Sequence, residues 1–172
     1  MMKDFTNEPI DITTLPRYEA VNLNALQPKY WNVILFNIGA IFLLIGIASA
    51  VIIYFVEEIH SMAWLFGLVY VLFLGFTFFL CRISFHKRGF AFREHDVIYR
   101  SGILATNTMI IPYNRVQHVA LHEGFISRYF DLAKVEIFTA GGDSSDVSIP
   151  GIKKEQAEDI KQLLMGKIQK QL

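Results

Sequence analysis

This sequence contains little cysteine and few charged residues, and its net charge is zero. The 172 residues include one cysteine, Cys81, which excludes a disulfide framework within the chain and any multi-cysteine zinc or iron–sulfur site. Charged residues make up 19% of the chain, against about 25% in typical soluble domains, and 53% of the residues are hydrophobic. This composition excludes a disordered chain. The 16 basic and 16 acidic side chains cancel, and because nucleic-acid-binding proteins usually carry a basic excess, we expect no nucleic-acid partner.

Charge is missing altogether from two long stretches, residues 31–56 and residues 62–81. A helix needs about 20 apolar residues to span a membrane, so these stretches predict two transmembrane helices with about these bounds. Trp31, Tyr54 and Trp64 lie near the ends of the stretches, where interfacial aromatic residues are expected. The short segment between the stretches allows only a tight turn, so we expect the two helices to form a hairpin.

Two other interpretations fit the apolar stretches less well. A buried hairpin in the core of a soluble protein would need a larger remainder of the chain to cover it. A signal peptide cleaved at Ala48-Ser49-Ala50 is disfavoured because 30 residues precede the first stretch, which is also too long for a signal sequence.

Basic residues predict the orientation of the hairpin. The turn at 57–61 has no lysine or arginine, whereas five basic residues flank the other side: Lys29, Arg82, Lys87, Arg88 and Arg93. Lysine and arginine tend to stay on the cytoplasmic side, so both termini are expected there. The chain then divides into a mostly irregular tail over 1–29, a transmembrane hairpin over 30–81 and a cytoplasmic domain over 82–172.

The pattern after the second stretch changes to short strands and ends in a helix. Alternating apolar residues predict strands over 83–92, 97–101, 104–111, 116–122 and 134–140, with a turn at 93–96 and a short helical segment within 125–132. Gly141-Gly142-Asp143 predicts a hairpin turn before a returning strand. Residues 153–172 have helical periodicity, with an apolar stripe formed by Ala157, Ile160, Leu163, Leu164 and Ile168. We therefore expect antiparallel strands whose inner face is covered by the last helix.

Several short motifs in this region resemble one protein family. The string IPYNRVQHV at 111–119, TAGG at 139–142 and IPGI at 149–152 are similar to motifs of the bacterial pleckstrin-homology (PH) family of YdbS-like membrane proteins. The stretch SRYFDL at 127–132 resembles another family motif, but Asp131 stands where glycine is usual, so the following turn is expected to differ locally. The resemblance covers about residues 15–170.

The resemblance implies an α+β membrane protein: a two-helix transmembrane hairpin followed by a PH-like split antiparallel β-barrel capped by a C-terminal α-helix. It also implies a location in the bacterial inner membrane and no known enzymatic activity. Members often occur beside a longer relative with several copies of the domain, so such a relative is an expected partner.

The neutral total charge hides an asymmetry between the two halves. Residues 1–81 hold 3 basic and 6 acidic side chains, whereas residues 82–172 hold 13 basic and 10 acidic ones. A basic surface near the anionic inner leaflet could bind lipid, each nearby cation contributing roughly 1 kcal/mol. The other interpretation is the ordinary positive-inside bias, which needs no lipid recognition.

Residues with recognisable chemistry are few. The sequence contains no glycine-rich phosphate loop, nucleophile elbow or dinucleotide fingerprint, so we expect no catalytic residues and no cofactor. His118 and His122 would lie roughly 13 Å apart on one face of a strand, too far apart for one metal ion. We interpret them as partly exposed strand residues. Cys81 is interpreted as a small apolar helix residue, with acylation as the alternative.

Two sets of residues are candidates for binding. Contacts with a partner or with lipid are predicted for five basic residues: Lys87, Arg88, Arg93, Arg100 and Arg115. For Arg115 a structural role next to a proline-ended strand is the alternative. The mixed signs at 93–96 argue against binding of inositol phosphates. Helix–helix contacts are predicted for five residues of the hairpin: Asn37, Gly39, Gly46, Gly67 and Gly75.

The sequence thus favours a membrane-anchored, non-catalytic interaction or scaffold protein. Its PH-like domain is expected to bind another membrane protein, such as a longer relative, or a second copy of the chain. An anionic-lipid-sensing module is one alternative. A transport or channel subunit built from the two helices is another, although the lack of charge in the helices disfavours a conduction path without oligomerisation.

Overall fold

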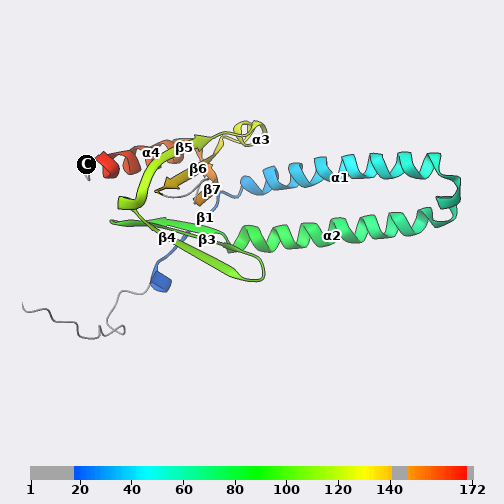
Figure 1. Ribbon diagram of the computed structural model, residues 1–172, viewed down its shortest axis with the longest axis horizontal. Coiled ribbons are helices and arrows are strands. Elements are labelled where there is room, and N and C mark those ends of the chain that lie inside the picture. Colours follow the sequence, from blue (N-terminus) through cyan, green and yellow to red (C-terminus); the bar gives the residue numbers. More distant parts are fainter. Residues whose placement is uncertain (1–17, 141–146, 170–172) are drawn as a thin grey trace, which may run out of the picture.

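The computed structural model describes residues 18–140 and 147–169. Two long helices lie side by side and project from one end of a domain made of two sheets and a helix (Figure 1). The helices are α1 (Tyr30–Phe55) and α2 (Ala63–Lys87), joined by the 3-10 helix η3 (Glu57–Met62). Both are long and apolar enough to cross a membrane, and most of their large side chains are exposed. The predicted apolar hairpin is therefore confirmed, and a buried core hairpin is not observed.

Aromatic side chains hold the two helices together. The Trp31 ring packs on Phe78 and Phe85, with centroids 5.4 and 5.7 Å away, and the Phe42 ring packs in the same way on Tyr70 at 5.7 Å. The Tyr70 hydroxyl also donates a hydrogen bond of 2.8 Å to the carbonyl of Phe42. In a hydrocarbon environment such a donor has few other partners, so this bond ties the helices to each other.

Helix α2 continues to Lys87, beyond the predicted end at Cys81. The guanidinium of Arg82 lies over the Trp31 ring, 4.8 Å from its centroid, and Phe85 reaches the core of the domain. Residues 83–87 were predicted to belong to a strand but form the end of α2 instead. The first strand after the hairpin therefore starts only at Gly89.

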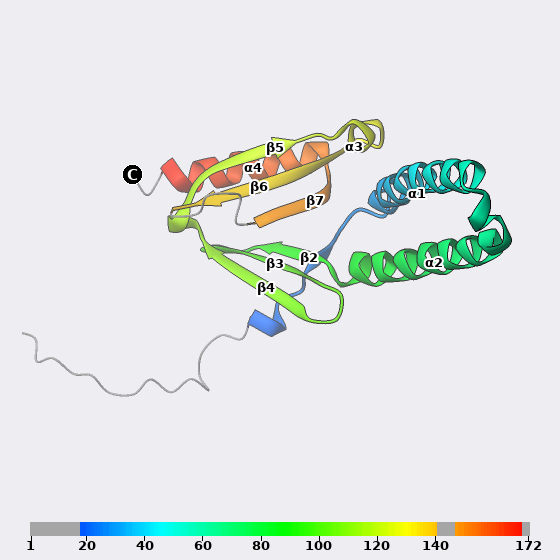
Figure 2. The same cartoon turned by 45° about the vertical axis from the view of Figure 1, so that its right-hand side comes forward.

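Two antiparallel sheets form the domain, as predicted (Figure 2). The first has the order β1-β2-β3-β4, with the strands β1 (Asn24–Ala25), β2 (Gly89–Phe92), β3 (Asp96–Gly102) and β4 (Thr106–Pro112). The second has the order β5-β6-β7, with β5 (Val116–His122), β6 (Leu132–Thr139) and β7 (Val147–Lys153). Three further short helices are η2 (Tyr18–Ala20), η4 (Tyr113–Arg115) and α3 (Phe125–Tyr129). The predicted turn at Gly141-Gly142-Asp143 lies outside the described residues.

The last helix, α4 (Lys154–Gln169), closes the core as expected. Its residues Ala157, Ile160 and Leu164 are buried in the same core cluster as Val97 of β3 and Ile149 of β7. Leu163, which was predicted to belong to the buried stripe, is instead 45% exposed. The two sheets and α4 therefore share a single hydrophobic core.

Part of the predicted N-terminal tail belongs to this domain. Asn24 and Ala25 pair with β2, and Leu26 is buried in the core. The N–H of Gln27 donates a hydrogen bond of 2.9 Å to the carbonyl of Gly151 in β7. The segment that leads into α1 thus contacts both sheets, which connects the hairpin to the domain on two sides.

Candidate interaction surfaces

The strand directions give the domain two ends with different surroundings. At the helix-proximal end, the β3–β4 turn and α3 lie on either side of the helical hairpin (Figures 1 and 2). At the far end are the β2–β3 turn and η4. The candidate residues can be assigned to one end or the other.

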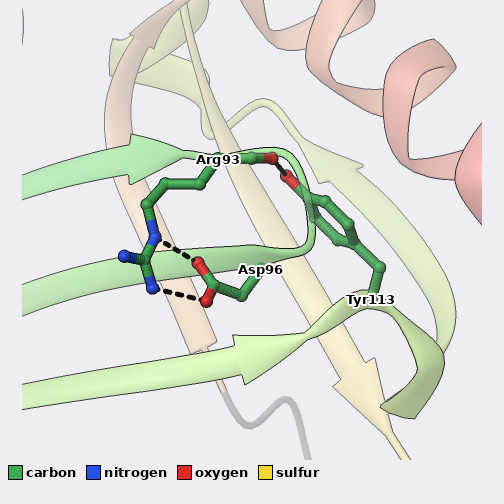
Figure 3. Close-up of polar contacts among 3 residues, drawn as sticks. All are labelled: Arg93, Asp96 and Tyr113. Carbon is green, nitrogen blue, oxygen red and sulfur yellow. Dashed lines mark hydrogen bonds and ion pairs between the residues drawn. The ribbon is translucent and has the colours of Figure 1, made fainter. Parts of the chain in front are cut away.

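Arg93, Asp96 and Tyr113 form a closed polar cluster at the far end (Figure 3). The Arg93 guanidinium binds both carboxylate oxygens of Asp96, with 2.6 Å from Nε to Oδ1. The Tyr113 hydroxyl donates a hydrogen bond of 2.6 Å to the carbonyl of Arg93, and the Tyr113 N–H donates one of 3.0 Å to the carbonyl of His95. The tyrosine of the IPYNR motif therefore holds the β2–β3 turn in place.

Burial and charge shift the pKa values within this cluster. Tyr113 is 2% exposed, and its burial, followed by the negative charge of Asp96, raises its pKa to about 12. The hydrogen bond to Asp96 raises the pKa of Arg93. Lys167 of α4 covers the cluster, because its ammonium donates a hydrogen bond of 2.9 Å to the carbonyl of Glu94 and lies 5.8 Å from the centre of the Tyr113 ring. Arg93 thus has a structural role in the β2–β3 turn, and its predicted contact with lipid or partner stays a prediction.

A groove of about 280 Å³ lies beside this cluster, along β4. It is lined by Met109, Ile110, Ile111, Pro112, Arg115 and Thr139. Strand β4 is at the edge of its sheet, so one side of its backbone has no strand neighbour among the described residues. Ile110 is 40% exposed there, and Arg115 is exposed while its carbonyl accepts a hydrogen bond of 3.1 Å from the N–H of Ala140. The structure thus places one predicted contact residue, Arg115, in an apolar groove at a sheet edge.

The other three basic candidates gather at the helix-proximal end. Lys87 ends α2, and its ammonium donates a hydrogen bond of 2.6 Å to the carbonyl of Ile103 in the β3–β4 turn. Arg88 and Arg100 are neighbours, because Gly89 pairs with Arg100 across β2 and β3. The Nε atoms of both arginines are buried and have no hydrogen-bond partner within the described part of the chain. The five residues therefore do not form one site, since Arg93 and Arg115 lie at the opposite end.

The predicted helix–helix residues are distributed differently from the expectation. Gly46 faces α2, where an added Cβ would lie 3.2 Å from the Tyr70 hydroxyl. An added Cβ at Gly39, Gly67 or Gly75 would meet nothing within 4 Å. Asn37 is exposed, so it does not pack against α2. Contacts of these four residues with another chain remain a prediction.

The histidines and the cysteine do not converge. Within the described ranges there is no group of three or more histidine, cysteine, aspartate or glutamate side chains that could hold a metal ion. The His118 ring stacks on Phe138, with centroids 4.1 Å apart. Cys81 is half-buried on α2.

An apolar helical hairpin, two facing antiparallel sheets and a closing helix define a membrane protein with a PH-like domain. The family described as "Bacterial PH domain" matches residues 13–168, and the chain belongs to this family. The chain is similar to the transmembrane protein YdbS of Bacillus subtilis (strain 168), with 32% identity over 142 residues, which covers 80% of this chain and 87% of that protein. No solved structure matches the chain.

Proposed function

We propose that the chain is a multi-pass protein of the bacterial inner membrane, with both termini in the cytoplasm. The connection between the helices contains Glu57 and Glu58 but no lysine or arginine. Basic residues gather where the hairpin meets the domain, among them Lys29, Arg82 and Lys87. This distribution favours a cytoplasmic domain.

Its function in this proposal is non-catalytic: the PH-like domain binds a partner membrane protein, such as a longer relative with several PH-like domains. The observation that carries the proposal is the edge of β4 beside the groove, which no other strand of residues 18–140 and 147–169 pairs with. Proteins usually protect a long edge strand with charge, proline or a covering segment, because an open edge pairs with other chains. Pro112 stands only at the end of β4, and Met109 and Ile110 provide apolar surface in its middle.

An extended segment of the partner can add to this edge by backbone hydrogen bonds, with its side chains in the groove. Arg115 lies where it can bind an acidic group of that segment. The groove lies toward the far end of the domain, which points away from the hairpin (Figure 1). A membrane partner would therefore need a domain of its own that extends into the cytoplasm.

Site-specific crosslinking in native membranes tests this proposal. A photoreactive amino acid at position 110 is expected to give a reproducible adduct with a membrane protein, identified by mass spectrometry. The matched control carries the same group at Glu158, on the exposed face of α4. Failure to form any adduct at position 110, or the same adducts from both positions, would contradict binding at the β4 edge.

Binding of anionic lipid is a second candidate function, supported by the cluster of Lys87, Arg88 and Arg100. These three cations lie together where the hairpin meets the domain, which favours an anionic group at this end. Native mass spectrometry of the purified full-length protein is expected to detect retained phosphatidylglycerol, less of it in the variant Arg88→Gln/Arg100→Gln. Equal retention by the wild type, this variant and the control Lys161→Gln on α4 would argue against lipid recognition by this cluster.

A further inference from the structure

Three side chains of the domain are more exposed than any other large apolar residue in the described ranges. They are Leu104 at 95%, Phe125 at 89% and Tyr129 at 84%. Leu104 lies in the turn between β3 and β4, and the other two lie on α3. Both segments project from the helix-proximal end, one beside α2 and the other beside α1 (Figures 1 and 2). Exposed apolar side chains concentrated on two loops usually mark a surface that another apolar medium covers.

The β3–β4 turn lies beside the C-terminal end of α2 and shares a hollow with apolar side chains of this helix. Ile103 and Leu104 line a hollow together with Phe76, Phe79, Leu80 and Ile83 of α2. At a rise of 1.5 Å per residue, Phe76 lies about 16 Å before the end of the helix at Lys87. Phe76 and Phe79 belong to the stretch without charge, so the hollow joins the turn to residues that contact hydrocarbon when α2 is in the bilayer.

Helix α3 makes the corresponding contact on the other side of the hairpin. Phe125 and Tyr129 line a hollow together with Phe36 of α1, which is about 9 Å along the helix from its first residue, Tyr30. Phe36 is also in a stretch without charge. Apolar side chains of the hairpin therefore adjoin those of the β3–β4 turn on one side and of α3 on the other.

Polar groups of these loops lie where lipid headgroups are expected. The hydrogen bond from Lys87 to the carbonyl of Ile103 attaches the turn to α2 and places an ammonium next to it. Arg128, which is exposed, lines the same hollow as Tyr129. A cation beside an exposed aromatic residue is typical of a protein surface at a membrane interface, where the ring enters the apolar region and the cation binds phosphate.

We propose that the β3–β4 turn and α3 insert into the leaflet at which the hairpin begins and ends. The bilayer is the occupant of both apolar surfaces, because these surfaces adjoin apolar side chains of the helices. Leu104 on one side and Phe125 with Tyr129 on the other give the domain two attachments in addition to the hairpin. The domain then has a fixed orientation, with the β4 groove directed away from the membrane. The inference needs the hairpin to lie in the bilayer but does not depend on the proposed partner.

Depth-dependent fluorescence quenching tests the insertion. The full-length chain, with Cys81→Ser, receives one new cysteine in each variant: Leu104→Cys or Tyr129→Cys. A bimane label on each is measured in phosphatidylcholine–phosphatidylglycerol vesicles that contain two spin-labelled lipids, one labelled near the headgroup end of the acyl chain and one near its middle. Leu72→Cys, on the exposed face of α2, is the embedded control, and Glu94→Cys, whose side chain is 81% exposed at the far end, is the aqueous control.

The expected result is at least a two-fold loss of fluorescence at positions 104 and 129, similar to position 72, with little change at position 94. Quenching at position 72 but not at 104 and 129 overturns the proposal. A blue-shifted but unquenched signal at 104 and 129 also overturns it, because the loops would then be covered by protein. Cys81→Ala replaces Cys81→Ser if the serine variant fails to fold.

Discussion

The ring of Tyr30 packs directly on the backbone of Gly151. A Cβ added at residue 151 would lie 2.5 Å from Cγ of Tyr30, closer than any real contact of a Cβ atom. Gly151 also has a φ of +67°, a conformation that residues with side chains rarely adopt. Tyr30 is the first residue of α1 and Gly151 lies in β7, so this contact fixes the start of the hairpin against the second sheet. The glycine of the IPGI motif is thereby explained by packing and backbone conformation.

Replacement of Gly151 by alanine is therefore expected to destabilise the protein. The variant Gly151→Ala combines an unfavourable φ, which costs about 1 kcal/mol or more, with a steric clash against Tyr30. We expect a loss of about 2–4 kcal/mol, measured by thermal unfolding of the full-length protein in mild detergent. The matched control is Gly166→Ala in α4, where an added Cβ meets nothing within 4 Å and helix propensity predicts a gain of up to about 1 kcal/mol. Equal midpoints for Gly151→Ala and the wild type would contradict the tight contact.

The contact between Tyr30 and Gly151 also shows what the sequence could not predict. The missing charge at 31–56 and 62–81 was enough to predict the hairpin, and alternation was enough to predict β5, because both signals are local. The pairing of β1 with β2 and the packing of Tyr30 on β7 join residues far apart in the chain. A two-residue strand has no periodicity to detect, so this part of the N-terminal segment was predicted to be irregular.

The candidate sites were predictable only in part. From residue type alone we predicted contacts for five basic residues. The register of the strands in the first sheet places these residues at opposite ends of the domain. The ion pair of Arg93 with Asp96 had a local signal, because opposite charges three residues apart flank the predicted turn. No local signal in the sequence indicated the exposure of Leu104, Phe125 and Tyr129, because single apolar residues in loops are common.

The raised pKa of Tyr113 predicts a loss of stability at alkaline pH. The folded protein keeps the phenolic proton up to a pH of about 12, whereas the unfolded chain loses it near its ordinary pKa of about 10. This contribution is fully present below pH 10 and is lost as the pH rises through about 12. It amounts to about 2 kcal/mol at most, after allowance for solvent screening.

Unfolding of the wild type and of Tyr113→Phe, compared at several pH values, measures this effect. At pH 8 we expect Tyr113→Phe to be less stable by about 1–2 kcal/mol, because the carbonyl of Arg93 loses its buried donor. Between pH 10 and 12 the difference is expected to shrink, because only the wild type loses a proton from this residue. A constant difference across this range would show that Tyr113 does not titrate as predicted.

Asp131 provides a prediction in the stabilising direction. Its φ is 59°, and it is the one residue other than glycine in the described ranges with a positive φ. This left-handed conformation explains why glycine is usual at this position. Asp131→Gly is expected to raise the unfolding free energy by about 0.5–1 kcal/mol, since glycine adopts this φ without strain. The control Asp159→Gly, within α4, is expected to lower it by a few tenths of a kcal/mol. A destabilised Asp131→Gly would instead indicate that the aspartate side chain contributes to the turn.

Gly46 provides a test of how the two helices pack. Its hydrogen atoms face the Tyr70 hydroxyl, which an added Cβ would approach to 3.2 Å. A larger side chain, as in Gly46→Leu, must displace Tyr70 and thus break its hydrogen bond to the carbonyl of Phe42. We expect Gly46→Leu to lower the unfolding midpoint in detergent and to weaken a disulfide crosslink engineered between the two helices.

Gly39→Leu is the matched control, because that position has open space and its substitution is expected to leave the hairpin intact. If Gly39→Leu changes the oligomeric state while the hairpin crosslink is unaffected, the outer face of α1 contacts another chain. If instead both variants weaken the crosslink equally, the two helices do not pack through Gly46 and Tyr70.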